Sequence, residues 1–241
     1  MLFTTGVLSF QTIAQEKSST YSDQYWLQYY GQLQLNSKWT LLGDAGIRMK
    51  HACSEKAATL GRMGIQYTIN NSFSVAMGGA YFSQYISNSI SREEWRGWQE
   101  LFYKHKLKRL FLSHRIRLEE RFFHSLLTQK DNFNYRLRYR LYLTIPLNHS
   151  QMRSNTIYII GGDEIFMNFG EQIIYNYDQN RLIAGLGYKL NDKLMINMTY
   201  VYQFAQKSSS INFERTDVIW LGIVHSIKKK EKASPIKDEQ K

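Results

Sequence analysis

Two stretches of the chain place arginine at alternate positions. In HRIRLEERF, residues 114–122, arginines alternate with isoleucine and leucine, and NYRLRYRLYLTIP, residues 134–146, repeats the pattern. Successive side chains of a β-strand point to opposite faces. Each stretch is therefore typical of a strand with one charged face and one apolar face.

The same period-two alternation runs through eleven segments, and helical periodicity is almost absent. These segments exceed the five or six residues that are roughly typical of strands in soluble sandwiches. They match the roughly 9 to 11 residues that a tilted strand needs to cross a bilayer. The pattern predicts an all-β, antiparallel up-and-down transmembrane β-barrel of about 10–12 strands. The expected strands are 24–35, 38–50, 57–69, 72–86, 95–107, 109–122, 132–146, 155–168, 178–190, 193–206 and 212–227.

The sequence also predicts the number of strands and the lengths of the connections between them. Single-chain bacterial barrels have even strand numbers, which favours ten or twelve strands over eleven. The connections alternate in length, so we expect short turns on one rim and long loops on the other. Tight connections are expected at 36–37, 70–71, 108 and 191–192, and longer ones at 51–56, 87–94, 123–131 and 169–177.

The polarity of the two faces favours an apolar exterior and a polar lumen. In the segment 132–146, one face is aromatic and aliphatic, whereas the other carries Arg136, Arg138 and Arg140. Tyrosines near strand ends are suited to the two membrane interfaces. They are Tyr25, Tyr67, Tyr85, Tyr139, Tyr188, Tyr200 and Tyr202.

Composition narrows the possible classes of protein. The chain has 241 residues, 15% of them aromatic and only two of them proline, which argues against a disordered protein. No run of about 18 apolar residues is present, so a membrane-spanning helix is not expected. Much of the positive charge behind the net charge of +11 lies in the expected strands, and the sequence shows no recognition helix. A nucleic-acid-binding function is therefore disfavoured. Small anionic solutes and the phosphates of outer-membrane lipid and lipopolysaccharide are the expected partners, and no oligomeric state is indicated.

Three parts of the chain are distinguished along the sequence. Residues 1–15 resemble a secretory signal without its usual basic start, residues 16–227 form one barrel domain, and residues 228–241 form a charged flexible tail. The single cysteine, Cys53, provides neither a disulfide framework nor a metal quartet. We therefore expect an exported protein of the bacterial outer membrane, with the periplasm as the alternative location.

The charged strand faces predict a lattice across neighbouring strands. Opposite charges directly across an antiparallel pair attract, and arginine binds carboxylate and phosphate with two parallel hydrogen bonds. Three interpretations remain: a structural lattice that hydrates or fills the lumen, an anion-selective or ligand-binding lumen, and a catalytic site. The candidate residues are Glu100, Arg115, Arg117, Glu119, Arg121, Arg136, Arg138, Arg140, Glu164 and Arg181.

A catalytic site finds little support among the motifs. His124-Ser125, His149-Ser150 and His225-Ser226 are neighbours in sequence, and neighbours on a strand point to opposite faces. The common hydrolase, metalloprotease and nucleotide-binding motifs are absent. No enzyme activity and no cofactor are expected.

Four stretches in order carry a resemblance to a known family: HRIRLEERF, NYRLRYRLYLTIPLN, IYIIGGDEIFMNFG (157–170) and YDQNRLIAGLGYKLNDKLMINMTYVYQF (177–204). They resemble the domain-of-unknown-function 2490 family of Gram-negative envelope proteins. That pattern has arginine-rich strands, a Glu-Ile-Phe-x-Asn element, and an Asp-Gln-Asn-Arg element before a Gly-x-Gly-Tyr strand. The resemblance extends from Trp26 to His225, with Asp163 as a minor departure. It implies an outer-membrane β-barrel of unassigned activity.

The sequence therefore predicts a narrow or plugged pore, or a structural or ligand-binding envelope protein, with an arginine-rich lumen. A lipid-modifying hydrolase of the outer membrane is one alternative. A soluble periplasmic β-sandwich or lipocalin-like binder is the other.

Overall fold

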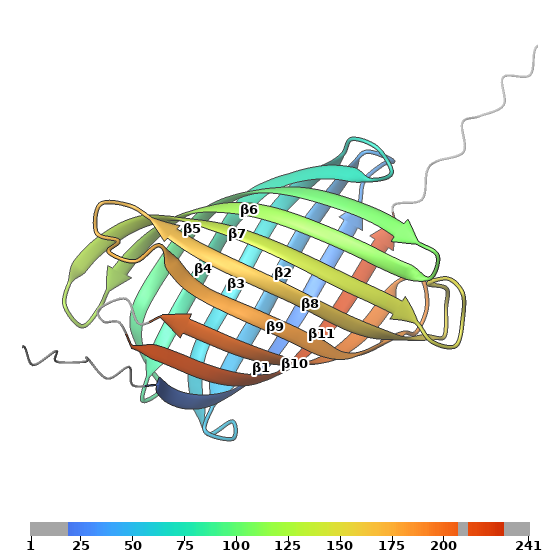
Figure 1. Ribbon diagram of the computed structural model, residues 1–241. Helices are drawn as coiled ribbons and strands as arrows, with labels where there is room; N and C mark the ends of the chain where they lie inside the picture. Colours follow the sequence, from blue (N-terminus) through green and yellow to red (C-terminus); the bar gives the residue numbers. More distant parts are fainter. Residues whose placement is uncertain (1–18, 207–211, 229–241) are drawn as a thin grey trace, which may run out of the picture.

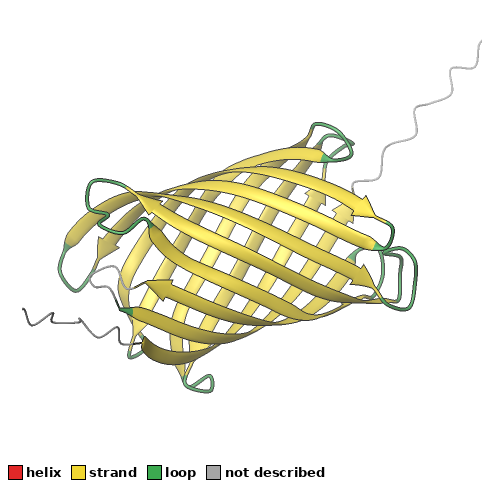
Figure 2. Ribbon diagram, viewed as in Figure 1, coloured by secondary structure: helices red, strands yellow, loops and turns green. Residues whose placement is uncertain are grey.

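The protein is a closed barrel of eleven β-strands in a computed structural model that describes residues 19–206 and 212–228 (Figures 1 and 2). A helical membrane span is absent from these two ranges. The strands are β1 (Ser19–Gln34), β2 (Trp39–Lys50), β3 (Glu55–Thr68), β4 (Phe73–Ile86), β5 (Ser89–Leu107), β6 (Leu110–Ser125), β7 (Lys130–Pro146), β8 (Thr156–Phe169), β9 (Tyr177–Lys189), β10 (Leu194–Gln206) and β11 (Phe213–Lys228).

The seam of the barrel is a parallel pair. Every other strand pair is antiparallel and joins neighbours in the chain, whereas β1 pairs with β11 in parallel from Ser19↔Phe213 to Gln34↔Lys228. An odd number of up-and-down strands requires this, because the first and last strands then run in the same direction. The all-β barrel and its segments are confirmed, and the preference for an even strand number is wrong.

The two rims of the barrel are named by the chain ends that reach them. The N-terminal rim is where β1 begins at Ser19, and the C-terminal rim is where β11 ends at Lys228. The predicted signal segment 1–15, and the tail 228–241 apart from Lys228, lie outside the described residues.

The connections do not show the predicted contrast between the rims. The expected long loop 87–94 is a turn at Ser87 and Asn88, whose φ angles of 48° and 62° are typical of a two-residue hairpin. The strands on either side of 123–131 also extend further than expected, which leaves a connection of 126–129. The longest connection between described strands, 147–155, lies on the C-terminal rim, where the other connections are tight.

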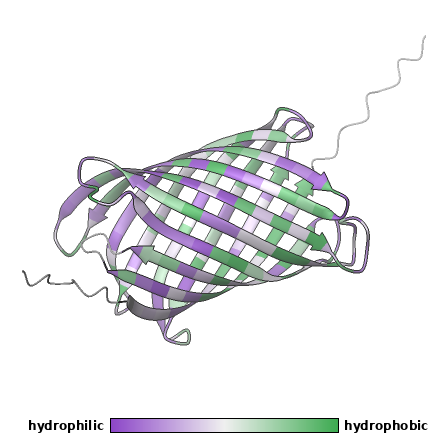
Figure 3. Ribbon diagram, viewed as in Figure 1, coloured by the Kyte–Doolittle hydropathy of each residue, from purple (hydrophilic) through white to green (hydrophobic). Residues whose placement is uncertain are grey.

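The two faces of the barrel wall have opposite polarity, as predicted. Met63 and Met77 on the outer face are 77% and 57% exposed, whereas Arg117 and Glu119 inside are 5% and 1% exposed. The alternation of hydrophobic and hydrophilic residues is visible along the strands in Figure 3. The charged face of the wall is therefore buried and the apolar face is exposed, which is the reverse of the arrangement in a soluble sandwich.

Aromatic rings gather on the outer face near both rims. Near the N-terminal rim, Phe122 and Phe133 lie 4.6 Å apart between ring centroids. Near the C-terminal rim, Phe73 stacks on Tyr103 at 4.7 Å, and the hydroxyl of Tyr139 lies 2.9 Å from Nδ1 of His114. Exposed aliphatic side chains such as Leu118 and Leu137 lie between these two groups, together with exposed tyrosines such as Tyr200 midway along β10.

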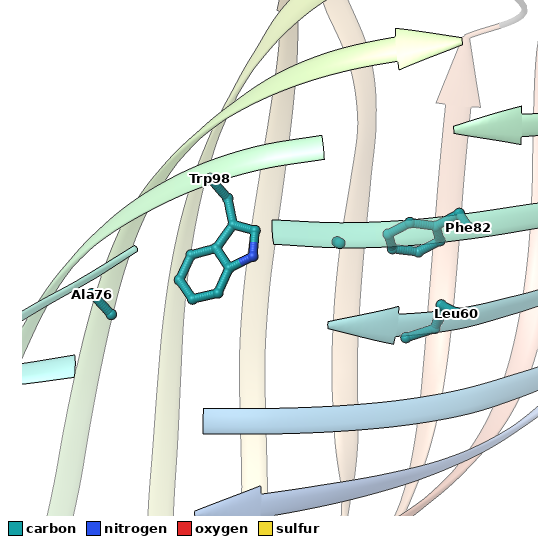
Figure 4. Packing of buried hydrophobic residues seen from close by; sticks show 5 residues of the cluster. Leu60, Ala76, Phe82 and Trp98 are labelled. Atoms are coloured by element: carbon teal, nitrogen blue, oxygen red, sulfur yellow. The ribbon is translucent and has the colours of Figure 1, made fainter. Parts of the chain in front are cut away.

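The interior also contains two apolar clusters. One joins Leu60, Ala76, Ala80, Phe82 and Trp98 from β3, β4 and β5, and Figure 4 shows the Trp98 indole with its neighbours. The other joins Trp26, Ile183, Val201 and Val218 from β1, β9, β10 and β11. The lumen is thus lined by apolar groups as well as charged ones.

Candidate functional site in the barrel lumen

Strand register brings the charged faces of β5, β6, β7 and β8 together inside the barrel. Glu100 pairs across from Arg117, and Arg117 pairs across from Arg138. Because side chains alternate, every second residue of these four strands points into the lumen. The charged residues of one strand therefore meet those of the next.

Glu119 on β6 is the centre of this arrangement. Its carboxylate accepts hydrogen bonds from Arg136 Nη2 at 2.6 Å and Arg138 Nη1 at 2.7 Å. Arg117 Nη1 lies 3.4 Å and Arg96 Nη1 3.7 Å from the same carboxylate. Glu119 is 1% exposed, so these four guanidinium groups take the place of water around a buried charge.

The other three glutamates each bind two arginines. Glu94 binds Arg96 and Arg121, Glu100 binds Arg115 and Arg117, and Glu164 binds Arg115 and Arg138. We call these ten residues the ion-pair lattice: Glu94, Arg96, Glu100, Arg115, Arg117, Glu119, Arg121, Arg136, Arg138 and Glu164. Its six arginines outnumber its four glutamates, and Asp178 adds one more carboxylate at 3.3 Å from Arg136 Nη1.

Aromatic rings cover the faces of several lattice guanidinium groups. The guanidinium carbon of Arg96 lies 3.6 Å from the ring centroid of Phe82, and that of Arg138 lies 4.5 Å from Phe166. Planar, weakly hydrated guanidinium groups tolerate this stacking better than ammonium groups do. The lattice and the apolar clusters therefore fill the middle of the barrel as one packed core.

The structure places eight of the ten predicted residues in the ion-pair lattice. Arg181 instead donates a hydrogen bond from Nε to Gln203 Oε1 at 2.9 Å. Arg140 pairs in register with Glu164 but forms no ion pair with any described residue, and its guanidinium carbon lies 4.1 Å from the ring centroid of Tyr142.

Glu94 and Arg96 belong to the lattice but were missed by sequence reasoning. Glu94 fell within the predicted loop 87–94, whereas β5 begins at Ser89. The available signal is the stretch SREEWRGWQE, in which positions 94, 96 and 100 share one strand face.

A cavity of about 340 Å³ lies between the lattice and the C-terminal rim. Its charged lining has an excess of cations, and Asp44, one of its two carboxylates, accepts hydrogen bonds from Arg62 Nε and Gln28 Nε2, both at 2.9 Å. The charged lining residues are Asp44, Arg62, Glu100, Lys104, Arg115, Arg117 and Arg140.

Several buried N–H donors around this cavity lack an acceptor among the described residues. They are Nε of Arg115, Arg117 and Arg140, and Nε1 of Trp220. Buried polar groups are nearly always hydrogen-bonded, so each such donor calls for an acceptor. One lining acceptor, Glu100 Oε2, also lacks a hydrogen-bond donor among the described residues, so the four unpaired donors outnumber it. Together with the excess of cations, this imbalance suits a small anion.

The histidines of the histidine–serine neighbours contact other side chains. His124 Nδ1 lies 2.8 Å from Asp131 Oδ1, and His225 Nδ1 lies 2.8 Å from the Tyr29 hydroxyl. Ser125 accepts a hydrogen bond from the backbone of Thr128. His124, His225 and Ser125 thus each have a partner other than the sequence neighbour.

Comparison with known proteins gives one family. The sequence profile of the family described as "Protein of unknown function (DUF2490)" matches residues 23–214, which comprise most of the barrel. No curated protein gives a significant match. The matched region includes all ten residues of the ion-pair lattice. Because the match covers more than half of the 241 residues, the chain belongs to the DUF2490 family.

Proposed function

We propose that this protein is an outer-membrane β-barrel that binds a small anion in the lumenal cavity beside Arg140. The packed lattice in the middle of the barrel favours a plugged, ligand-binding barrel over a wide water-filled pore. The observation that carries the proposal is the guanidinium of Arg140, which faces a mostly cationic cavity without a carboxylate partner.

The outer face of the barrel supports the membrane location. Large apolar side chains are exposed around the wall, from Leu27 at 48% on β1 to Leu186 at 56% on β9. A contiguous apolar surface of this kind suits lipid, and the aromatic groups near both rims suit the two interfaces. The lumenal face, by contrast, is rich in charged side chains. In a barrel surrounded by water, these side chains would be expected on the outer face.

The charges of the cavity support an anionic ligand. Five cationic side chains and two carboxylates line it, and Asp44 is already occupied by Arg62 and Gln28. A carboxylate or phosphate accepts two parallel hydrogen bonds from an arginine, which satisfies donors that are costly to bury alone.

Fractionation of the producing cells tests the location. We expect the protein in the outer-membrane fraction. Its unboiled form should migrate faster in gel electrophoresis than the boiled form, because a closed barrel resists detergent. Recovery of the protein in the soluble periplasm would contradict the proposal and favour a soluble binder.

Replacing Arg140 with glutamine tests the anion site. We expect the substitution to weaken binding of acetate and inorganic phosphate to the folded protein about tenfold, as measured by calorimetry at low ionic strength. A charged hydrogen bond contributes about 1.5–3 kcal/mol, and about 1.4 kcal/mol is a factor of ten in affinity.

Lys130→Gln is the matched control, because Lys130 is an exposed cation at the opposite rim. It removes the same charge and should leave the affinity nearly unchanged. Equal losses in the two variants would indicate a general effect of net charge. The absence of anion binding to the unsubstituted protein would overturn the proposed function.

A further inference from the structure

We infer that the ligand of the lumenal cavity is a small amphipathic carboxylate, whose charged end meets Arg140 and whose hydrocarbon end meets the opposite wall. This inference rests on the proposed anion site and adds the chemical class of the ligand. It follows from the uneven distribution of charged and apolar groups around the cavity.

The two sides of the cavity come from opposite sides of the barrel. The closed strand order places β11 and β1 farthest around the ring from β6. β6 and its neighbours β5 and β7 carry Arg115, Lys104 and Arg140. β11 contributes Trp220, Gly222 and Val224, none of which is charged. The neighbouring strands β10 and β1 add the uncharged polar residues Asn197, Thr199 and Gln32. The cavity thus has a cationic wall and, opposite it, an uncharged side with an apolar strip on β11, which we call the apolar wall.

The apolar wall is held in place by packing. The Trp220 ring meets the Trp26 ring edge-on at 5.3 Å between centroids, and it packs against the buried cluster that includes Val201 and Val218. Both valines are 0% exposed. Tyr142 from β7 packs against the same cluster and so connects the two walls. A surface of this kind is preformed rather than created by side-chain collapse around a ligand.

The size of the cavity fits an organic ion better than an inorganic one. An apolar cavity of about 150 Å³ is enough to hold benzene, and this cavity measures about 340 Å³. An inorganic anion would satisfy the donors of the cationic wall but leave the apolar wall against water. An aromatic or short aliphatic carboxylate satisfies both walls, because burial of its hydrocarbon part adds to the attraction of its charge.

Three water-soluble probes separate these contributions. Benzoate carries both parts, acetate carries the charged end without the ring, and benzyl alcohol carries the ring without the charge. For the folded protein in detergent, we expect benzoate to bind at least about tenfold more tightly than acetate. The reason is the free energy gained when the apolar ring face is buried. Benzyl alcohol should bind more weakly than benzoate by about the same factor or more. Calorimetry measures all three, and the unboiled gel mobility checks that the barrel is intact.

Gly222→Val fills the apolar side without touching the cationic one. A Cβ at Gly222 would lie 3.5 Å from Tyr30 Cε2, an ordinary contact, so the barrel should accept it. We expect this variant to lose most of the preference for benzoate over acetate while keeping acetate affinity. Gly61→Val is the matched control, because a Cβ at Gly61 meets no atom within 4 Å and Gly61 shares the outer face of β3 with Met63.

The outcomes distinguish this inference from the proposed function. Equal affinity for benzoate and acetate would overturn the amphipathic ligand but leave the anion site standing. Tight binding of benzyl alcohol would also overturn it, because charge would then be dispensable. Failure of both anions to bind would overturn the proposed function itself. If Gly222→Val does not fold, Val224→Thr tests the same wall with nearly unchanged shape, and the comparison of probes on the unsubstituted protein needs no variant.

Discussion

Glu119→Gln is expected to destabilise the barrel by about 3–5 kcal/mol, because it removes one side of a buried charge network and leaves the other side in place. Glu119 meets Arg96, Arg117, Arg136 and Arg138. Each of the four keeps one other carboxylate, Glu94 for Arg96, Glu100 for Arg117, Asp178 for Arg136 and Glu164 for Arg138, so the substitution adds one uncompensated positive charge to the network. A neutral amide preserves the shape of the side chain but cannot compensate four guanidinium groups. The lost stability therefore reports the removal of the Glu119 charge rather than a change in side-chain volume.

Equilibrium unfolding by urea in detergent micelles measures this free energy. Glu171→Gln is the control, because Glu171 lies exposed in the connection between β8 and β9 and should change stability by less than about 0.5 kcal/mol. If Glu119→Gln matched that control, the lattice would not carry the energetic role assigned to it. High salt should not rescue the variant, since buried pairs are screened far less than exposed ones.

Gly78→Ala is expected to destabilise the barrel by about 3 kcal/mol or more, or to prevent assembly. A Cβ at this position would clash with the backbone oxygen of Met63 and lie 2.5 Å from the Trp98 ring. The first contact is with backbone of the neighbouring strand, which cannot rotate away. The second is with a ring that is 4% exposed and packed within the cluster of Figure 4. Overpacking of a filled core typically costs about 1–3 kcal/mol, and a backbone clash exceeds that range.

Gly61→Ala tests whether glycine in a strand is enough to explain the effect. Gly61 lies in β3, and an added Cβ meets nothing within 4 Å. Alanine there should be neutral or stabilise the barrel by up to about 1 kcal/mol, because it reduces the freedom of the unfolded chain. Unfolding midpoints and the yield of fast-migrating unboiled protein compare the two variants. Similar losses at both positions would show that strand propensity, not the Trp98 packing, determines the result.

Much of the fold was predictable because strand periodicity is a local property. Alternation in HRIRLEERF assigns Arg115, Arg117 and Arg121 to one face, whatever the rest of the chain does. The same reasoning correctly located the eleven strands and the polar lumen. It failed at Glu94, because a Ser-Asn turn with two positive φ angles is a weaker hairpin signal than Asn-Gly.

The candidate site was predictable as a set of residues but not as a pattern of partners. Arg140 stands directly across from Glu164, so strand register alone would pair them. In the barrel, Arg138 Nη2 and Arg115 Nη2 donate hydrogen bonds to Glu164 Oε1 at 2.7 Å and 2.5 Å. Arg140 lines the cavity instead. Which arginine stays unpaired depends on rotamers and on side chains from three strands, so no alternation within one strand can decide it.

The sequence by itself determined the strands, their two faces and the excess of arginine over carboxylate in the lumen, because each depends on residues close together in the chain. The tertiary structure alone decided the odd strand number closed by a parallel seam, which depends on residues nearly two hundred positions apart, such as Ser22 and Thr216. It also decided that the apolar wall of β11 faces the arginines of β6, because only closure of the sheet brings strands five places apart around one cavity.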